Sequence, residues 1–265
     1  MYEKVNPAHP DKIADRIAGA VVDLCYLKRK KPACACEVLI GHGWCNVIIE
    51  TNVLNLKKSE VRNIVRRITG KLLIAVDVLI VPQDPQLRHA QLECDKCGDN
   101  GIFKGSPVTE EQKQLTKIAK DIYKKYPTDG KYLIEGSKLV ICQSKANDEK
   151  IKKMYPDAVI NPLGKWTGGI DVDTGATNRK LGSDMGDAVT GGGLHGKDLS
   201  KADVTLNIYC HIIAQNRKKP FSLSCNIGQD MVDGQSYKML MAVVHQWILK
   251  NYGSFEKLAE WGLIK

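Results

Sequence analysis

Residues 161–203 constrain the fold more than any other part of this sequence. They hold ten of the chain's 23 glycines and almost no apolar residues at helix or strand spacing. Such a segment adds little to a hydrophobic core, so the core must come from the residues on either side. Long polar segments inside a globular chain are typical of binding or catalytic sites.

Helix and strand patterns alternate along the rest of the chain. Helices are expected from Pro10 to the basic run at 28–31, over 61–68, from Thr109 to about Tyr126, over 203–216 and over 237–250. Strands are expected over 37–53, as two strands joined at a Gly-His-Gly turn, and over 72–81, 138–143 and 221–227. The apolar run 72–81 should be buried, and the polar stretch 83–107 should be a long loop. The mixture predicts an α+β or α/β fold of several small layers.

Composition narrows the class of protein. The chain has 265 residues, of which 43% are hydrophobic and 26% charged. This composition excludes an intrinsically disordered or fibrous protein and fits one or two globular domains. No apolar run approaches the ~20 residues of a membrane helix, and the first residues do not resemble a signal peptide, so we expect a cytoplasmic protein. Nine cysteines, mostly among apolar neighbours, indicate reduced core thiols. The net charge of +9 favours an anionic partner, which leaves nucleic acid, a membrane surface or a small polyphosphate open.

Residues 191–197 match the spacing of a phosphate-binding P-loop, Gly-x-x-x-x-Gly-Lys. Asp198 then replaces the Ser or Thr that would hold magnesium, and no apolar strand leads into the motif, so a Walker fold is not expected. Glycines still let backbone N–H groups approach an anion, and the lysine adds a positive charge. A plain glycine-rich surface loop is the alternative.

Cations and carboxylates are interleaved around this loop. Arg179, Lys180, Lys197 and Lys201 alternate with acids that include Asp173 and Asp203. Cations that hold phosphates beside carboxylates that hold Mg²⁺ are what a magnesium-polyphosphate site requires, because Mg²⁺ prefers hard oxygen ligands. The same pairing recurs at His9 and Asp11, just before a predicted helix N-terminus. A solvated mixed-charge surface is the alternative.

The pair Cys94 and Cys97 has the spacing of a zinc or redox motif. A structural zinc site takes four ligands, and no second Cys-x-x-Cys follows. We therefore interpret both residues as incidental loop cysteines.

Several segments, in order along the chain, resemble the motifs of S-adenosylmethionine synthetases, or methionine adenosyltransferases. Residues 6–15, Asn-Pro-Ala-His-Pro-Asp-Lys-Ile-Ala-Asp, resemble the family's Gly-His-Pro-Asp-Lys signature and the Ile-Ala-Asp after it. Residues 98–101 are similar to its Gly-Asp-Gln-Gly element, 129–131 to Asp-x-Lys, and 160–166 to its Asn-Pro-x-Gly-Arg-Phe strand. Residues 173–180 and 191–203 resemble its most diagnostic block. This chain departs from the pattern with Asn100 for Gln and Lys165 for Arg, and it is shorter than the family's members.

The resemblance implies a fold of similar α/β subdomains, each with a sheet and helices, truncated in the central and C-terminal parts. We expect an N-terminal region 1–110 with a mobile active-site loop at 83–99, a shortened central region 111–160, and a region 161–265 with the glycine-rich catalytic segment and a C-terminal subdomain. The implied activity is synthesis of S-adenosyl-L-methionine from ATP and L-methionine. The methionine sulfur attacks ribose C5′, and the released triphosphate is hydrolysed to pyrophosphate and phosphate.

The resemblance also implies roles for individual residues. The catalytic triphosphate-binding set would be His9, Lys131, Arg179, Lys180, Lys197 and Lys201. Asp129 would bind the ribose of ATP, and Trp166 would stack on its adenine. Methionine would be bound by Glu50, Gln83, Asp99 and Asp173. Two Mg²⁺ ions would be held by Asp11 and Asp203, and K⁺ by Glu37.

In this family each active site lies between two subunits, so residues near Asp11 and Asp203 would complement Glu50 and Asp99 of the partner chain. We therefore expect a homodimer, with a tetramer as the alternative. We expect neither nucleic acid nor a membrane as a partner, because aromatic residues make up only 6% of the chain and its cations cluster with acids. The alternative function is that of a weak or inactive homologue that binds ATP or S-adenosylmethionine in a regulatory role.

Overall fold

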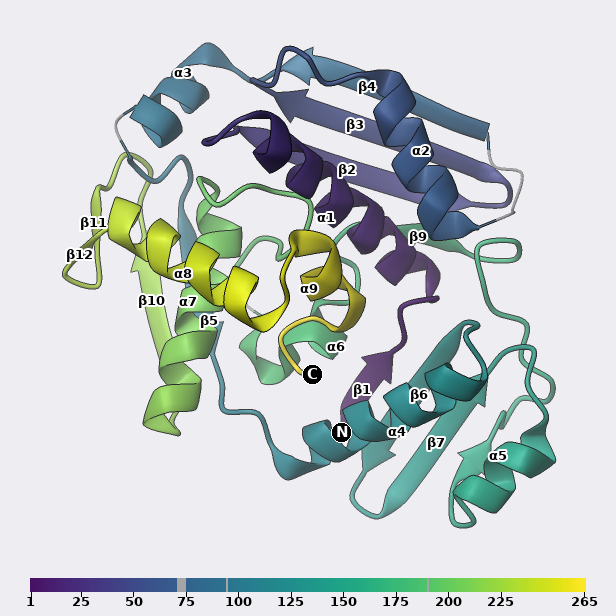
Figure 1. Ribbon diagram of the computed structural model, residues 1–265. Coiled ribbons are helices and arrows are strands. Elements are labelled where there is room, and N and C mark those ends of the chain that lie inside the picture. The colour runs from purple at the N-terminus through teal and green to yellow at the C-terminus, as the bar shows by residue number, and fades with distance from the viewer. Residues whose placement is uncertain (71–74, 94, 190) are drawn as a thin grey trace.

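The computed structural model describes residues 1–70, 75–93, 95–189 and 191–265. The first of its two four-stranded sheets has the order β4–β3–β2–β9, with bounds Ala75–Pro82, Trp44–Thr51, Cys34–Gly41 and Thr174–Ala176. Helices α1 (Pro10–Lys28) and α2 (Lys58–Thr69) lie across one face of this sheet (Figure 1). Residues on the other face alternate with the buried ones and are largely exposed.

Helix α1 begins where the sequence predicts it. Pro10 occupies the first turn, where its missing N–H costs nothing, and the His9 side chain accepts a hydrogen bond from the Asp11 N–H. Ile13, Ile17 and Val21, which recur at helical spacing, are at most 7% exposed. The helix lies between the sheet and α9 (Phe255–Trp261), so its first turn is in the interior of the protein.

The predicted pair of strands around the Gly-His-Gly turn is confirmed as the antiparallel hairpin of β2 and β3. His42 and Gly43 in the turn have φ of 50° and 77°, which glycine adopts without strain. Inward-facing residues such as Val38 and Val47 are at most 2% exposed.

A strand is present where the run 72–81 predicted one, but the expectation that this strand is buried is wrong. Strand β4 runs parallel to β3 at the edge of the sheet, and within it only Val78 is buried. An apolar run does not reveal whether a strand lies at the centre or at an edge, and here one face of the sheet is open. The remainder of that prediction, residues 72–74, falls outside the described residues.

The single long loop expected over 83–107 is also wrong. Asp84 caps the short helix α3 (Pro85–Arg88) by accepting the Leu87 N–H, and a π-helical turn, η1 (His89–Glu93), follows directly. Strand β5 (Gly101–Gly105) then pairs with β10 (Phe221–Cys225), which confirms most of the strand predicted at 221–227. The helical pieces are too short to produce a periodic pattern.

The second sheet has the order β1–β6–β7–β8, with bounds Tyr2–Val5, Gly130–Glu135, Lys138–Gln143 and Val159–Ile160. Helix α4 (Glu110–Lys125) packs on it and starts at the predicted capping box of Thr109 and Gln112. Helix α5 (Asp148–Met154) lies beside β8. Leu115, Ile122, Tyr132 and Ile141 form a core that is separate from the larger core under the first sheet. Among these strands only β7 was predicted from its own pattern. The strand implied at 160–166 by the resemblance is wrong beyond Ile160, where β8 ends.

Residues 161–203 are mostly irregular, as expected, with only β9, the short helix α6 (Leu181–Met185) and the 3₁₀ turn η2 (Gly186–Ala188) among those described. The elements that follow are α7 (Ala202–Arg217), β10, the small hairpin of β11 (Met231–Val232) and β12 (Gln235–Ser236), α8 (Tyr237–Asn251) and α9. The helices predicted at 203–216 and 237–250 are confirmed.

Two polar contacts tie the ends of the chain together. Lys4 is 2% exposed, and its Nζ donates hydrogen bonds to the carbonyls of Ser183, Trp261 and Ile264 at 3.1, 2.6 and 2.6 Å. Burial lowers the pKa of Lys4 to about 7. The Asp23 carboxylate caps α9 by accepting the N–H groups of Phe255 and Glu256 at 2.8 and 2.9 Å.

The cysteines that the structure describes are free thiols, and all but the half-buried Cys142 are buried, which agrees with reduced core residues. Cys94 lies outside the described residues. In the described part of the chain, every helix is too short or too polar to cross a bilayer.

Candidate active site

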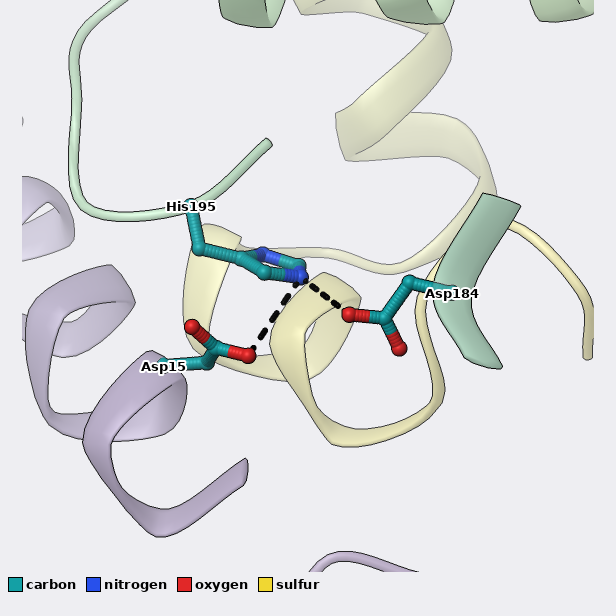
Figure 2. A group of neighbouring side chains, drawn as sticks. All are labelled: Asp15, Asp184 and His195. Carbon is teal, nitrogen blue, oxygen red and sulfur yellow. Dashed lines mark hydrogen bonds and ion pairs between the residues drawn. The ribbon is translucent and has the colours of Figure 1, made fainter. Parts of the chain in front are cut away.

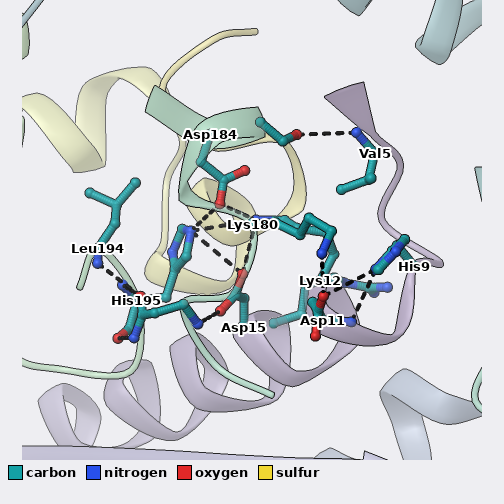
Figure 3. Close-up of polar contacts among 12 residues, drawn as sticks. Val5, His9, Asp11, Lys12, Asp15, Lys180, Asp184, Leu194 and His195 are labelled. Carbon is teal, nitrogen blue, oxygen red and sulfur yellow. Dashed lines mark hydrogen bonds and ion pairs between the residues drawn. The ribbon is translucent and has the colours of Figure 1, made fainter. Parts of the chain in front are cut away.

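The first cluster of predicted site residues lies at the N-terminus of α1. Asp11 is 2% exposed, and its Oδ2 accepts a hydrogen bond from Lys180 Nζ at 2.6 Å (Figure 3). Asp11 Oδ1 accepts the Ala176 N–H at 2.9 Å and lies 3.7 Å from Arg179 Nε. The guanidinium of Arg179 is more than half exposed. The structure therefore joins three residues that the sequence predicted separately.

His9 adjoins this cluster as a neutral, buried imidazole. Its burial, together with the Lys180 charge, lowers the pKa of His9 to about 4. His9 Nδ1 accepts the Asp11 N–H at 3.2 Å, which assigns the ring proton to Nε2. Burial opposes ionisation of Asp11, but hydrogen bonds from Lys180 and Ala176 outweigh it and lower the pKa of Asp11. At neutral pH the cluster presents one N–H donor and an ion pair.

The second cluster surrounds Lys197, just before α7. Lys197 Nζ donates to Asp203 Oδ2 at 2.9 Å and lies 3.8 Å from Glu37 Oε1. Asp203 Oδ2 also accepts the Gly193 N–H at 3.1 Å. Burial opposes the charge of Lys197, but Asp203 and Glu37 raise its pKa overall.

A polar pocket of about 240 Å³ opens beside this second cluster. Its walls include Asp99 and Asn100 before β5, Gln91 from η1, and Lys197, Lys201 and Asp203. Asp99 is exposed and its negative charge helps to raise the pKa of Lys197. Four predicted residues, Asp99, Lys197, Lys201 and Asp203, thus share one cavity within a single chain. The expectation that Asp99 meets Asp203 only from a partner chain is therefore wrong.

Strand β9 and the residues after it touch both clusters. A Cβ at Gly175 would lie 2.1–2.4 Å from backbone atoms of Pro10 and Asp11, so only glycine permits this approach. On the other side, the Thr177 hydroxyl donates to the Glu37 carboxylate, which is next to Lys197. Residues 174–180 therefore bridge the two groups of cations.

Asp129 is the most unusual carboxylate of the predicted set. It is 2% exposed, and neither of its oxygens has a hydrogen-bond partner among the described residues. Burial raises the pKa of Asp129 to about 7, Asp173 and Asp11 add to the shift, and the Gly169 amide and Lys131 oppose it. A Cβ at Gly168 would lie 2.5 Å from Asp129 Oδ2, so the backbone there lies directly against the carboxylate. A buried acceptor without a donor is costly to leave unfilled.

Lys131 and Asp173 belong to the surroundings of the first cluster. Lys131, on β6, is 40% exposed and lies 3.9 Å from Glu3. Asp173 is exposed and accepts the Thr174 N–H. Both act on the His9 imidazole electrostatically, Lys131 lowering and Asp173 raising its pKa.

Three predicted residues are not joined to either cluster. Glu50 is exposed on the open face of the first sheet, beside Val81 of β4. Gln83 is 2% exposed, and its amide donates to Gln91 Oε1 at 3.2 Å. Trp166 is half-buried in the irregular segment before β9.

Sequence reasoning missed a buried polar network behind the site. Lys12 Nζ lies 2.6 Å from Asp184 Oδ2, 3.1 Å from Asp15 Oδ2 and 3.4 Å from His195 Nε2. All four side chains are at most 1% exposed. Figure 2 shows Asp15 from α1 and Asp184 from α6 converging on the His195 ring. The sequence signal was a lysine and an aspartate on the apolar side of a predicted helix.

Two groups of side chains can be compared as possible metal ligands, the buried network behind the site and the carboxylates of Asp11 and Asp203. In the described part of the chain, ligand atoms of Asp15, Asp184 and His195 lie within 4.8 Å of one another. The Lys12 ammonium lies 2.6 Å from Asp184 Oδ2 and 3.1 Å from Asp15 Oδ2, so a cation already occupies the space among these atoms. Asp11 and Asp203 are oxygen donors next to clustered cations, which fits Mg²⁺ held by one or two carboxylates together with phosphates.

Residues 1–73 match the family model described as the S-adenosylmethionine synthetase N-terminal domain. The chain is 28% identical to the S-adenosylmethionine synthase of Helicobacter acinonychis (strain Sheeba) over 276 aligned positions, which cover 81% of this chain and 72% of that protein. It is 25% identical to the S-adenosylmethionine synthase of Flavobacterium psychrophilum, with 81% and 69% covered.

The fold is similar to a solved structure described as an unusual S-adenosylmethionine synthetase from Campylobacter jejuni. The TM-score is 0.75 at 19% identity, and the match covers all of this chain and 95% of that chain. This likeness confirms the predicted α+β fold class and its architecture.

Proposed function

The chain belongs to the S-adenosylmethionine synthetase family, and from this premise we propose that it is a methionine adenosyltransferase that makes S-adenosyl-L-methionine from ATP and L-methionine. The observation that carries the proposal is the pair of ammonium–carboxylate contacts, Lys180–Asp11 and Lys197–Asp203, bridged by residues 174–180. One ammonium and one carboxylate lie on each side of residues 174–180. Such an arrangement suits the binding of a polyanion together with metal ions.

The chemistry requires positioning and charge stabilisation. A sulfur lone pair forms the S–C5′ bond while the C5′–O bond breaks, and triphosphate leaves with that electron pair. No proton has to move, because the product is a sulfonium cation. The protein must therefore hold the sulfur in line and stabilise the departing negative charge.

The charged clusters supply that stabilisation. Lys180 and Lys197 now pair with Asp11 and Asp203, and a bound triphosphate would draw both ammonium groups to its oxygens. Arg179 and Lys201 would add contacts from the same two segments, and Lys131 a further one from β6. His9 would donate a hydrogen bond from its Nε2–H to the leaving oxygen, because Nδ1 is engaged by the Asp11 N–H.

Asp11 and Asp203 would hold two Mg²⁺ ions once their lysines turn to the phosphates. Mg²⁺ bound there supplies charge neutralisation on the triphosphate. Glu37 is the proposed K⁺ ligand. Its carboxylate is about half exposed, one oxygen accepts from the Thr177 hydroxyl, and the other lies 3.8 Å from Lys197 Nζ, so K⁺ would take the place of Lys197 once that ammonium turns to the phosphates.

The nucleoside would be bound through Asp129. Its two unpartnered oxygens match the two adjacent hydroxyl donors of a ribose. Trp166 would stack on adenine. Support for this assignment comes from the two Asp129 oxygens, which have no hydrogen-bond partner among the described residues; the backbone at Gly168 would have to move aside to admit the ribose.

Methionine would be bound by Glu50, Gln83, Asp99 and Asp173, with Glu50 supplied by a second subunit. Glu50 lies on the open face of the first sheet, where Leu39, Trp44, Ile48 and Leu79 are 40–49% exposed. Exposed apolar side chains that gather on one sheet face indicate a protein interface. We therefore propose a homodimer with active sites at the subunit interface, and a tetramer as the alternative.

The division into regions 1–110, 111–160 and 161–265 is part of the proposal. It is supported by the separate core between α4 and the second sheet. A mobile gate at 83–99 and a cytoplasmic location also belong to it, the latter supported by the buried free thiols.

The test is incubation of the purified protein with ATP, L-methionine, Mg²⁺ and K⁺, followed by chromatography of the products, with methionine omitted as control. Methionine-dependent formation of S-adenosylmethionine, pyrophosphate and phosphate is the expected result. Triphosphate without phosphate would mean that the hydrolytic step is absent. ATP binding without any product would overturn the proposal in favour of the regulatory homologue.

A further inference from the structure

Asn178 lies between the two cation clusters and contacts both sides. It follows β9 and precedes Arg179 and Lys180. Its own N–H donates to Asp15 Oδ1 at 2.8 Å, which fixes the segment to α1. Its φ of 62° is left-handed, a conformation that asparagine tolerates better than most residues.

The Asn178 side chain uses both ends of its amide on the glycine-rich segment. Oδ1 accepts the N–H groups of Leu194 and His195 at 2.8 and 2.9 Å, and Nδ2 donates to the His195 carbonyl at 3.1 Å. A Cβ at Gly193 would lie 2.6 Å from Asn178 Nδ2, so glycine at 193 is needed for this approach.

These contacts lead directly to both proposed magnesium ligands. On one side, Ala176 and Lys180, two residues before and after Asn178, hold the two oxygens of Asp11. On the other, the Gly193 N–H, next to Leu194, holds Asp203 Oδ2, and Gly192 lies so close to Asp203 that a Cβ would be 2.3 Å from the Asp203 Cβ. Asn178 is the side chain that links the two backbones.

Resting on the proposed function, we propose that Asn178 is a positioning residue that sets the spacing between Asp11 and Asp203, and so the spacing of the two Mg²⁺ ions bound with triphosphate. Strand β2 also contacts both segments, through Cys36 to Gly196 and Val38 to Thr177. Those contacts fix the chain on either side of Asn178. The turn at 193–195 is held from α7 by Asn207, which donates to the Gly193 carbonyl, and from the Asp11 side by Asn178.

Two substitutions separate positioning from folding. Asn178→Gly keeps the left-handed backbone free of strain but removes all three side-chain hydrogen bonds. Asn178→Asp keeps the acceptor for Leu194 and His195 but places an oxygen opposite the His195 carbonyl. The matched control is Asp233→Gly in the β11–β12 turn, where φ is 52° and the side chain accepts a hydrogen bond from Tyr209.

The first measurement is calorimetric titration of Mn²⁺ into the full chain with a non-hydrolysable ATP analogue. Wild type and Asp233→Gly should bind two Mn²⁺ ions per site. Asn178→Gly should weaken one of them at least tenfold, and Asn178→Asp should lie between. In kinetics, the Mg²⁺ concentration for half-maximal rate should rise about tenfold while the KM for methionine stays within twofold.

Unchanged Mn²⁺ affinities in Asn178→Gly, with a fall in melting temperature like that of Asp233→Gly, would overturn the inference and leave the proposed function standing. A wild type that binds no Mn²⁺ with the analogue would overturn both. If Asn178→Gly does not fold, Asn178→Asp decides the question, because wild-type metal affinity with the opposed oxygens in place is incompatible with the spacing role.

Discussion

Lys12 Nζ and Asp184 Oδ2 lie 2.6 Å apart in the interior, although 172 residues separate them in the sequence. Burial disfavours the charged form of Lys12, but the attraction of Asp184 and Asp15 outweighs it and raises the pKa of Lys12. Burial also disfavours the charged form of Asp184, but Lys12 and His195 outweigh it and lower the pKa of Asp184. The pair joins the first turn of α1 to α6, directly behind the segment that carries Lys180 (Figure 3).

Removing the lysine should therefore destabilise the fold strongly. Lys12→Met leaves Asp15 and Asp184 buried without their cation, and the expected loss is about 3–5 kcal/mol of unfolding free energy. Urea denaturation followed by circular dichroism measures it. The control Lys113→Met breaks the exposed pair with Glu110 and should cost under about 1 kcal/mol. Similar losses in both variants would contradict a buried, paired charge.

His211 should make the protein sensitive to mild acid. Burial lowers the pKa of His211 to about 4, below the ordinary 6.5. The unfolded chain then binds more protons between pH 6.5 and 4, so stability falls as the pH falls through that window, by roughly 3 kcal/mol in total. Denaturation midpoints of wild type and His211→Gln, compared at pH 7.5, 5.5 and 4.5, test this. The variant should show a shallower decline, and parallel curves would exclude His211 as the cause.

Asp129→Asn separates nucleoside binding from triphosphate binding. A hydrogen bond to a charged group contributes about 1.5–3 kcal/mol, so the KM for ATP should rise at least tenfold. Hydrolysis of added tripolyphosphate should stay within twofold, because that substrate has no ribose. Steady-state kinetics with both substrates gives the answer. Equal losses for both would assign Asp129 to the phosphate site or to folding.

Lys197→Met should abolish product formation and leave methionine binding intact. The ammonium is the partner of Asp203 and one of the proposed contacts of the departing charge, so its loss should lower kcat at least a hundredfold. Chromatographic product assays and methionine calorimetry make the comparison, with the exposed Lys219→Met as control. Normal turnover in Lys197→Met would remove this lysine from the mechanism.

The open sheet face gives a prediction about assembly. Ile48 is 41% exposed and lies beside Leu79 of β4, so Ile48→Lys should place a charge in the proposed dimer interface. Light scattering should show a monomer, and activity should fall in parallel because Glu50 would no longer reach a partner's site. Leu27→Lys changes an exposed leucine of α1 and should leave the mass unchanged. A wild-type monomer with full activity would refute the shared site.

Periodic patterns predicted the elements that bury one continuous side. Helices α1, α4, α7 and α8 were found because their apolar residues repeat every three or four positions, and Thr109 with Gln112 marked a start by capping. Strand β4 was misjudged because an edge strand on an open face shows the same apolar run as a buried one. Strand β1, with four residues, has too few positions for a pattern.

The site could be anticipated only as a list of residue types. His9, Asp11, Lys180, Lys197 and Asp203 were recognised from motifs, and the structure adds which carboxylate holds which ammonium. The network of Lys12, Asp15, Asp184 and His195 could not be anticipated, because charged residues are normally expected at the surface and their partners lie on distant elements. Asn178 was overlooked for the same reason, since its role depends on contacts across the fold.

The contacts of Lys4 and Asp23 with residues 255–264 also determine when the N-terminal part of the chain can complete its folding during synthesis. The N-terminal strand and α1 leave the ribosome early, yet Lys4 needs the carbonyls of Trp261 and Ile264, and Asp23 has nothing to cap until α9 exists. Contacts of such high sequence separation form late and slow folding. Until α9 emerges, the Lys4 ammonium stays hydrated and the surface of α1 that packs against α9 stays exposed, so the N-terminal half cannot complete its packing before those residues are synthesised.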